Sequence, residues 1–146
     1  FVRYALGLPS AVSCSGWKRD STAYTDVCTT LLFDGPASVT AYASYEVPAS
    51  APFRMKYRAL FERGMLEYDV QQSPTLIEFG EDTFEKIDLS AEPDGYLAEC
   101  RYFVTCIMDN TPPVEASGRS AAETLRLLHS IRDSAERRGA WMDIER

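Results

Sequence analysis

The chain has 146 residues, of which 45% are hydrophobic and 25% are charged, the size and composition of one soluble globular domain. Its formal net charge of −7 argues against a nucleic-acid-binding surface, because phosphates are met by clustered Lys and Arg. No apolar run approaches the ~20 residues of a membrane span, and the opening residues lack the long apolar stretch of a signal peptide. We therefore expect neither a nucleic-acid partner nor a membrane partner.

The first seven residues are typical of the last turns of a helix that ends at Gly7, with Pro9 just beyond it. A domain seldom begins in the middle of a helix, and the chain opens on Phe1 without a methionine. We therefore expect the natural chain to start upstream of Phe1.

The segments between residues 11 and 89 have the short lengths, the alternation and the turn residues of β-strands. We expect strands over residues 11–17, 25–33, 37–47, 53–62, 65–70, 75–79 and 83–89. The alternation is clearest over 53–62, and Arg63-Gly64 then turns the chain. This spacing of strands and turns indicates antiparallel neighbours.

Two helices follow the strands, over residues 96–109 and 120–138, and Gly139 closes the second helix before a short final strand. Each helix carries one apolar stripe at helical spacing. The stripes consist of Tyr96, Cys100, Phe103, Val104 and Ile107 in the first helix and of Ala121, Leu125, Leu128, Ile131 and Ala135 in the second.

Strands first and helices last predict an α+β fold. We expect a single domain over residues 1–146, with an open, largely antiparallel sheet and helices on one face. The other face carries the small and tyrosine side chains of residues 37–47. These side chains suit burial against a partner, so we expect this face to be available for oligomerisation.

The sequence lacks the motifs that hold a dinucleotide or a metal. Its two closest glycines, Gly7 and Gly16, are nine residues apart, which excludes both G-x-G-x-x-G and the P-loop. The chain has a single histidine, its cysteines lack zinc-finger spacing, and the EF-hand pattern is not met. We therefore predict no catalytic, cofactor-binding or metal-binding residue in this chain.

The four cysteines form no C-x-x-C pair, which favours reduced, buried thiols in a cytoplasmic protein. A disulfide between Cys14 and Cys28, across neighbouring strands, is an alternative. A dyad of His129 with one of the thiols is another, although an exposed helix histidine is the simpler interpretation.

Two places in the sequence are candidates for contact with a ligand. Tyr96 lies in the first turn of a helix, where it is either a core-facing aromatic residue or a hydroxyl presented to a ligand. Phe53 and Arg54 open the clearest strand, where they are either structural or the lip of a pocket, with Arg54 meeting an anionic or hydroxylated substrate. The acidic run between Glu78 and Asp88 is interpreted as a solvated hairpin edge.

The order and spacing of several short motifs resemble a known protein family. These are Gly7-Leu8-Pro9-Ser10-Ala11-Val12, Pro52-Phe53-Arg54, Phe61-Glu62-Arg63-Gly64-Met65-Leu66, Gly95-Tyr96-x-x-Glu99-x-x-x-Phe103, Arg119-Ser120-Ala121, Leu125-x-Leu127, Ser134-Ala135 and Gly139. Together they cover nearly the whole chain. They resemble the C-terminal domain of the Gfo/Idh/MocA family, the relatives of glucose–fructose oxidoreductase and inositol dehydrogenase.

The resemblance implies a part of a two-domain enzyme. Members of this family join an N-terminal Rossmann domain, which binds NAD or NADP, to an α/β domain whose open sheet completes the substrate pocket and pairs the subunits. The family's catalytic lysine lies in a Glu-Lys-Pro motif of the first domain, and its aspartate and histidine lie on the helix that would end at Phe1. None of the three has a counterpart here, because Glu85-Lys86 is followed by Ile87 and His129 lies in the wrong element.

The family roles that this sequence can share, judged by matching positions, are those of substrate contact. The resemblance implies that Phe53, Arg54 and Tyr96 line the substrate pocket, and that the strands over 37–47 and 53–62 build an interface between identical subunits. It also implies that the chain itself holds no cofactor. The partner that is missing would be an N-terminal Rossmann domain, with NAD or NADP as the cofactor of the complete protein.

The resulting hypothesis is the substrate-side and oligomerisation domain of a cytoplasmic NAD(P)-dependent oxidoreductase that acts on a sugar, a polyol or a related hydroxyl compound. Such a domain would be inactive alone. The alternative is a freestanding oligomerising or small-ligand-binding α+β module with no enzymatic activity. A third hypothesis is a cysteine-dependent enzyme that uses Cys100 or Cys106.

Overall fold

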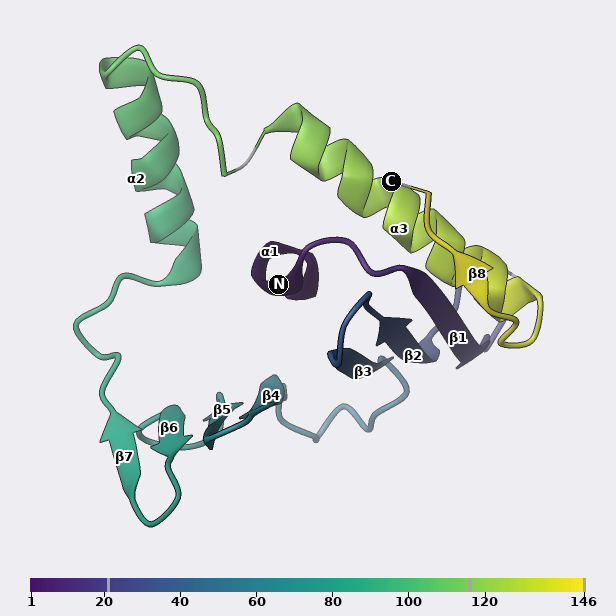
Figure 1. Cartoon of the computed structure of the whole chain (residues 1–146), viewed down its shortest axis with the longest axis horizontal. Coiled ribbons are helices and arrows are strands. Elements are labelled where there is room, and N and C mark those ends of the chain that lie inside the picture. Colours follow the sequence, from purple (N-terminus) through teal and green to yellow (C-terminus); the bar gives the residue numbers. More distant parts are fainter. Residues whose placement is uncertain (21, 116, 146) are drawn as a thin grey trace. The chain divides into compact units, whose positions relative to one another are not determined.

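The structure, a computed structural model, describes residues 1–20, 22–115 and 117–145 as two compact units (Figure 1). The first unit combines residues 1–48 with residues 113–146, and the second comprises residues 49–112. Unit 1 contains α1 (Val2–Leu6), β1 (Ala11–Trp17), β2 (Asp26–Leu32), β3 (Ser38–Ser44), α3 (Gly118–Glu136) and β8 (Met142–Asp143). Unit 2 contains β4 (Lys56–Phe61), β5 (Gly64–Asp69), β6 (Leu76–Phe79), β7 (Phe84–Ile87) and α2 (Gly95–Met108).

The predicted α+β class with antiparallel sheets is confirmed. Each unit has one four-stranded sheet, in the order β3-β2-β1-β8 in unit 1 and β4-β5-β6-β7 in unit 2, and the strands pair with antiparallel neighbours. The joining of both units into the single domain expected from the sequence stays a prediction.

The core of unit 1 lies between α3 and one face of its sheet. Val12 of β1, Leu31 of β2 and Leu127 of α3 are buried together, and Val39 of β3 packs against them. The register places Val12, Leu31 and Val39 opposite one another, so they share this face. Because successive strand residues alternate between faces, the other face carries the neighbouring residues. These are mainly small or hydroxyl side chains, with the larger Trp17, Leu32 and Tyr42 among them.

The face of α3 that is buried differs in part from the predicted stripe. Ile131 packs against the core and Ala135 is buried, as expected, but Leu125 and Leu128 are exposed. Leu127 and Ser134 are buried instead. The buried side of α3 includes polar residues because they have hydrogen-bond partners on other elements, and the apolar pattern alone does not show this.

The two ends of α3 are determined in different ways, by polar contacts at its start and by a glycine after its end. At its start, the guanidinium of Arg3 in α1 donates to Thr124 Oγ1 (2.7 Å), to Glu123 Oε2 (2.9 Å) and to the hydroxyl of Ser120. At its end, the chain reverses at Gly139, whose φ of 87° is readily adopted only by glycine. The predicted helix closure at Gly139 is therefore confirmed.

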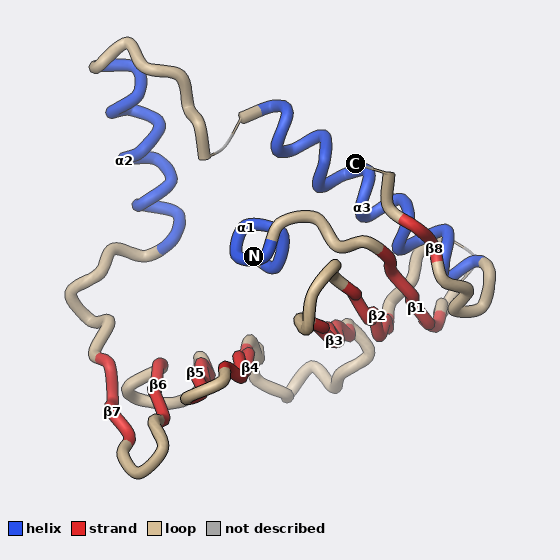
Figure 2. Tube along the Cα trace, viewed as in Figure 1, coloured by secondary structure: helices blue, strands red, loops and turns tan. Residues whose placement is uncertain are grey.

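In unit 2 the strands begin and end close to the predicted positions, with one exception. The strand expected from residue 53 begins at Lys56, because its neighbour β5 ends at Asp69, which pairs with Lys56. Residues 53–55 thus precede the strand. Residues 88–94 connect β7 to α2 without regular structure (Figure 2).

Helix α2 begins where the sequence predicts it. The carboxylate of Asp94 accepts hydrogen bonds from the backbone N–H groups of Tyr96 and Leu97, which makes Asp94 the N-cap. The predicted apolar stripe is exposed in this structure, and the buried residue of the helix is Cys106.

Candidate functional site

The predicted substrate residues Phe53 and Arg54 lie just before β4. The side chain of Phe53 is 74% exposed and that of Arg54 is 61% exposed. Arg54 Nη2 lies 3.4 Å from Asp69 Oδ2, in an ion pair with the last residue of β5. An exposed aromatic residue next to an exposed guanidinium is suited to contact a ligand, and the assignment of both residues to a substrate site stays a prediction.

Two further bonds hold the backbone of residues 53–55. The side-chain amide of Gln71 donates to Phe53 O (2.7 Å), and the backbone N–H of Val70 donates to Met55 O (3.0 Å). The segment is therefore fastened to the end of β5 at each of its three residues, although it is outside the regular strand.

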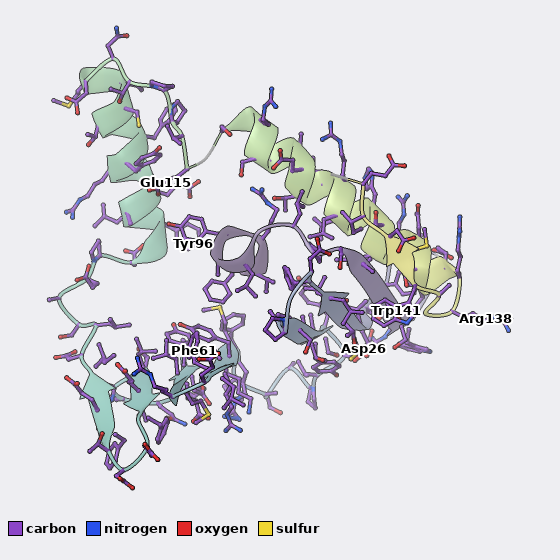
Figure 3. All side chains as sticks on the ribbon, in the orientation of Figure 1. Asp26, Phe61, Tyr96, Glu115, Arg138 and Trp141 are labelled. Atoms are coloured by element: carbon purple, nitrogen blue, oxygen red, sulfur yellow. The ribbon has the colours of Figure 1, made fainter. Side chains whose placement is uncertain are left out.

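Tyr96 projects from the first turn of α2 and is 84% exposed (Figure 3). In this structure it is therefore not the core-facing aromatic residue that the simpler interpretation expected. No hydrogen bond joins it to Phe53 or to Arg54 among the described residues. The roles of Phe53, Arg54 and Tyr96 in a substrate site therefore stay predictions.

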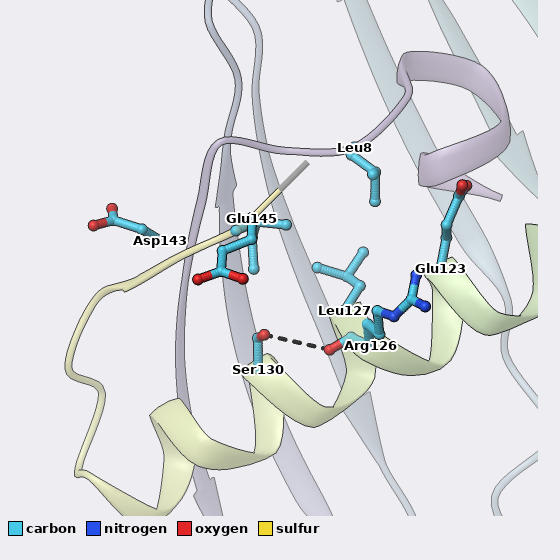
Figure 4. Close-up of a pocket in the computed structure, with 8 residues that line it drawn as sticks. Leu8, Glu123, Arg126, Leu127, Ser130, Asp143 and Glu145 are labelled. Carbon is cyan, nitrogen blue, oxygen red and sulfur yellow. Dashed lines mark hydrogen bonds between the residues drawn. The ribbon is translucent and has the colours of Figure 1, made fainter.

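A pocket of about 310 Å³ in unit 1 was not predicted from the sequence (Figure 4). It lies between α3, the C-terminal strand and the segment after α1. Its lining residues are Leu8, Glu123, Arg126, Leu127, Ser130, Asp143, Ile144 and Glu145. They come from three separate segments and form no motif, so nothing in the sequence pattern identifies them.

The cysteines do not form the disulfide considered above. All four thiols are free. Cys14 pairs with Thr29, whereas Cys28 pairs with Ser15, so the two cysteine side chains lie on opposite faces of the sheet. Among the described residues, no group of three or more His, Cys, Asp or Glu side chains could hold a metal ion.

The acidic run is an exposed hairpin, as expected. Glu78 of β6 and Glu85 of β7 are paired residues, and both are exposed. At the end of the run, the backbone N–H of Ser90 donates to Asp88 Oδ1 (2.8 Å) and lowers the pKa of that carboxyl. Asp88 is thus a charged residue that stabilises a turn.

A pair of titratable groups ties the end of β1 to the last turn of α3. Lys18 Nζ donates to Glu136 Oε1 (2.6 Å), which raises the pKa of Lys18 above 10.5 and lowers the pKa of Glu136 below 4.5. The stabilisation from this pair is therefore complete between pH 4.5 and pH 10.5. It is lost as the pH falls through the lowered pKa of Glu136 or rises through the raised pKa of Lys18.

We expect the variant Glu136→Gln to melt at a lower temperature than the original chain at neutral pH, because the ion pair is gone. The difference should shrink as the pH falls through the lowered pKa of Glu136, where the original carboxyl becomes neutral as well. Thermal unfolding at a series of pH values measures this. The double variant Lys18→Met/Glu136→Gln is the control, and a difference that is independent of pH would contradict the expectation.

Within the described part of the chain, no helix is long and apolar enough to cross a membrane.

Comparisons with known proteins identify the fold. No protein-family model matches the sequence, and no curated protein matches it. Solved structures do match. Levoglucosan dehydrogenase in complex with NADH and L-sorbose matches over 99% of this chain and 47% of its own, with 16% identity and a TM-score of 0.82. This chain has the fold of about half of that dehydrogenase.

Two further solved structures agree with this match. WlbA dehydrogenase from Bordetella pertussis, in complex with NADH and UDP-GlcNAcA, matches over 99% of this chain and 43% of its own, with 16% identity and a TM-score of 0.76. An inositol dehydrogenase homologue from Azotobacter vinelandii, in complex with NADH and myo-inositol, matches over 94% of this chain and 44% of its own, with 14% identity and a TM-score of 0.68. The predicted resemblance to Gfo/Idh/MocA-type oxidoreductases is confirmed for the fold, and this chain spans about half the length of each structure.

Proposed function

We propose that this chain is the substrate-side and oligomerisation domain of an NAD(P)-dependent oxidoreductase that acts on a sugar, a polyol or a related hydroxyl compound. The observation that carries the proposal is the match of 94–99% of this chain to about half of dehydrogenases solved with NADH. The remaining half of such a protein would be an N-terminal Rossmann domain, and the complete protein would work in the cytoplasm.

At the starts of α2 and α3 the described residues do not fit a dinucleotide, which supports a cofactor held elsewhere in the complete protein. A dinucleotide site uses the free backbone N–H groups of a helix that follows a glycine-rich turn. At α2 the carboxylate of Asp94 already accepts from those groups, and its charge would repel a phosphate. At α3 the hydroxyl of Ser117 accepts from Ser120 N. NAD or NADP would therefore supply hydride chemistry from the other half.

Within this chain, the proposed contribution to the reaction is to bind and orient the substrate. Phe53 and Arg54 are both exposed just before β4, and Tyr96 is exposed at the start of α2. An aromatic ring, a guanidinium and a phenol are the kinds of side chain that orient a hydroxyl-rich ring, the first through its apolar surface and the others through hydrogen bonds.

The proposed oligomer interface is the sheet face of unit 1 that lies opposite Val12, Leu31 and Val39. Along β1 and β2 its side chains are mainly small or hydroxyl-bearing, with the larger Trp17 and Leu32 among them. Tyr42 projects from β3 on the same face, where it donates to Asp26 Oδ2 (2.7 Å). A sheet face made mainly of small side chains can approach a second sheet closely. A second copy of the chain is the proposed partner.

We expect the natural polypeptide to be about twice as long as this chain, because the chain spans only 43–47% of the matched dehydrogenases. An immunoblot of the source cells against this domain measures that length. In the same experiment series, the chain alone should not bind NADH in a fluorescence titration, whereas the natural polypeptide should bind it. The natural polypeptide should also oxidise members of a panel of sugars and polyols that contains levoglucosan and myo-inositol.

Other outcomes would reject the proposal. NADH binding by the chain alone would remove the premise that the cofactor is held elsewhere. A natural polypeptide of 16.4 kDa, the mass of this chain, would leave the fold standing and favour the freestanding module. The face opposite Val12 would then be its functional surface.

A further inference from the structure

The feature that carries a further inference is the way in which the end of β5 holds residues 53–55. We infer that Asp69 is a positioning residue for the guanidinium of Arg54, and that Gln71 positions the backbone at Phe53, so that both face a substrate in a fixed orientation. The inference rests on the proposed function, since it assigns the residues that hold the proposed substrate contacts in place.

Asp69 has the burial and the bonding of a residue that orients another. Its side chain is only 7% exposed, at the end of a strand whose other side chains are half-buried. Its two oxygens have different partners. Oδ1 accepts from the backbone N–H of Gln71 (2.9 Å), while Oδ2 lies 3.4 Å from Arg54 Nη2. The bond to the backbone fixes the plane of the carboxylate, and the second oxygen is thereby held toward Arg54.

Arg54 is bound at one nitrogen and retains further donors. A guanidinium has five N–H groups, and only one nitrogen of Arg54 contacts Asp69. With 61% of the side chain exposed, the remaining donors can reach a ligand. Phe53, next to it and 74% exposed, adds an apolar surface. This combination favours a ring compound that carries hydroxyl or carboxylate groups at its edge.

Arg58 of β4, a second arginine paired with a carboxylate of β5, serves for comparison. Arg58 donates to Glu67 Oε2 through both Nε (3.1 Å) and Nη2 (2.5 Å), so two of its nitrogens contact the carboxylate rather than one. The side chain of Glu67 is 24% exposed, more than the 7% of Asp69. Arg58 lies in β4 whereas Arg54 precedes it, and the two pairs differ in the number of arginine nitrogens that contact the carboxylate.

The chemical reactivity of Arg54 tests the positioning. Phenylglyoxal modifies arginines, and peptide mass spectrometry measures the rate at each one. In Asp69→Asn, which can still accept from Gln71 N, modification of Arg54 should accelerate about two- to fivefold, the factor expected for the loss of a partly exposed ion pair. The matched control Glu67→Gln should accelerate Arg58 and leave Arg54 unchanged. An unchanged rate at Arg54 in Asp69→Asn would overturn the inference.

Kinetics of the natural polypeptide separate this inference from the proposed function. With the polyol or sugar that the panel identifies, Arg54→Ala should raise KM about tenfold, and Asp69→Asn should raise KM by a smaller factor with kcat unchanged. Arg63→Ala, an exposed arginine in the turn after β4, is the control. If Arg54→Ala leaves KM unchanged, the substrate role of Arg54 is wrong. If only Asp69→Asn leaves KM unchanged, the proposed function stands and the positioning role is wrong.

Discussion

Replacing Ser134 by alanine is expected to lower the free energy of unfolding of unit 1 by about 2 to 3 kcal/mol, because it removes two hydrogen bonds from a buried site. Ser134 is completely buried in α3. Its hydroxyl accepts from the backbone N–H of Cys14 (2.8 Å) and donates to Ala140 O (2.6 Å). It therefore joins the helix, the middle of β1 and the turn that leads into β8.

The position of β8 explains why this hydroxyl is needed. β8 pairs with β1 only at Ala11 and Val12. Beyond that point, no strand among the described residues lies beside this edge of β1, and the N–H of Cys14 donates to Ser134 instead. A buried donor that loses its partner costs about 1–3 kcal/mol. The lost hydrogen bond to the Cys14 N–H is therefore expected to contribute more to the destabilisation than the lost hydrogen bond to Ala140 O.

The matched control is Ser130→Ala, one helical turn earlier. Ser130 donates to Arg126 O of its own helix (3.3 Å) and has no hydrogen bond to another element within the described part of the chain, so its replacement should lower the free energy of unfolding by less than about 0.5 kcal/mol. Urea unfolding measures both variants, and hydrogen exchange should show a faster amide at Cys14 in Ser134→Ala alone. An equal decrease in the free energy of unfolding for the two variants would show that the hydrogen bonds of Ser134 to other elements add no stability.

The sequence predicts the elements well where local chemistry decides them. The strand expected over 11–17 is β1 (Ala11–Trp17), and the helix expected to end before Gly139 is α3. Alternation, capping residues and glycine at a left-handed position each act over a few residues, so they can be seen in the sequence itself.

The sequence does not predict features that depend on contacts between distant residues. Arg3 and Ser120 are 117 residues apart, and Ser134 and Cys14 are 120 apart. These contacts decide which side of α3 is buried, and they explain why Leu125 and Leu128 are exposed although the apolar pattern favours them.

The candidate site shows the same division. Phe53 and Arg54 can be proposed from the sequence, because an aromatic residue and an arginine follow a proline where the alternating pattern begins, although the strand itself begins at Lys56. Asp69 and Gln71 cannot, because nothing in the sequence distinguishes them from other polar residues before a turn. Their role depends on the antiparallel register of β4 and β5, which places Asp69 opposite Lys56 and close to Arg54.

The second large effect is expected at Gly64, the first residue of β5. A Cβ atom added at Gly64 would lie 2.6 Å from the backbone oxygen of Phe79 in the neighbouring strand. A side chain could rotate away from such a contact, whereas a paired backbone cannot move without separating β5 from β6. Gly64→Ala is therefore expected to destabilise unit 2 by about 1 to 3 kcal/mol, the usual cost of overpacking.

Gly95→Ala is the matched control in the same unit, because a Cβ atom there meets nothing within 4 Å. Gly95 is the first residue of α2, and alanine forms helices more readily than glycine. The free energy of unfolding of this variant should therefore rise by up to about 0.5–1 kcal/mol. Urea unfolding followed by hydrogen exchange at β5 and β6 measures both. The two Gly→Ala substitutions are thus expected to change the free energy of unfolding in opposite directions. Of these two glycines, Gly64 is the one at which the neighbouring strand leaves no room for a side chain. A loss of equal size at both positions would contradict this.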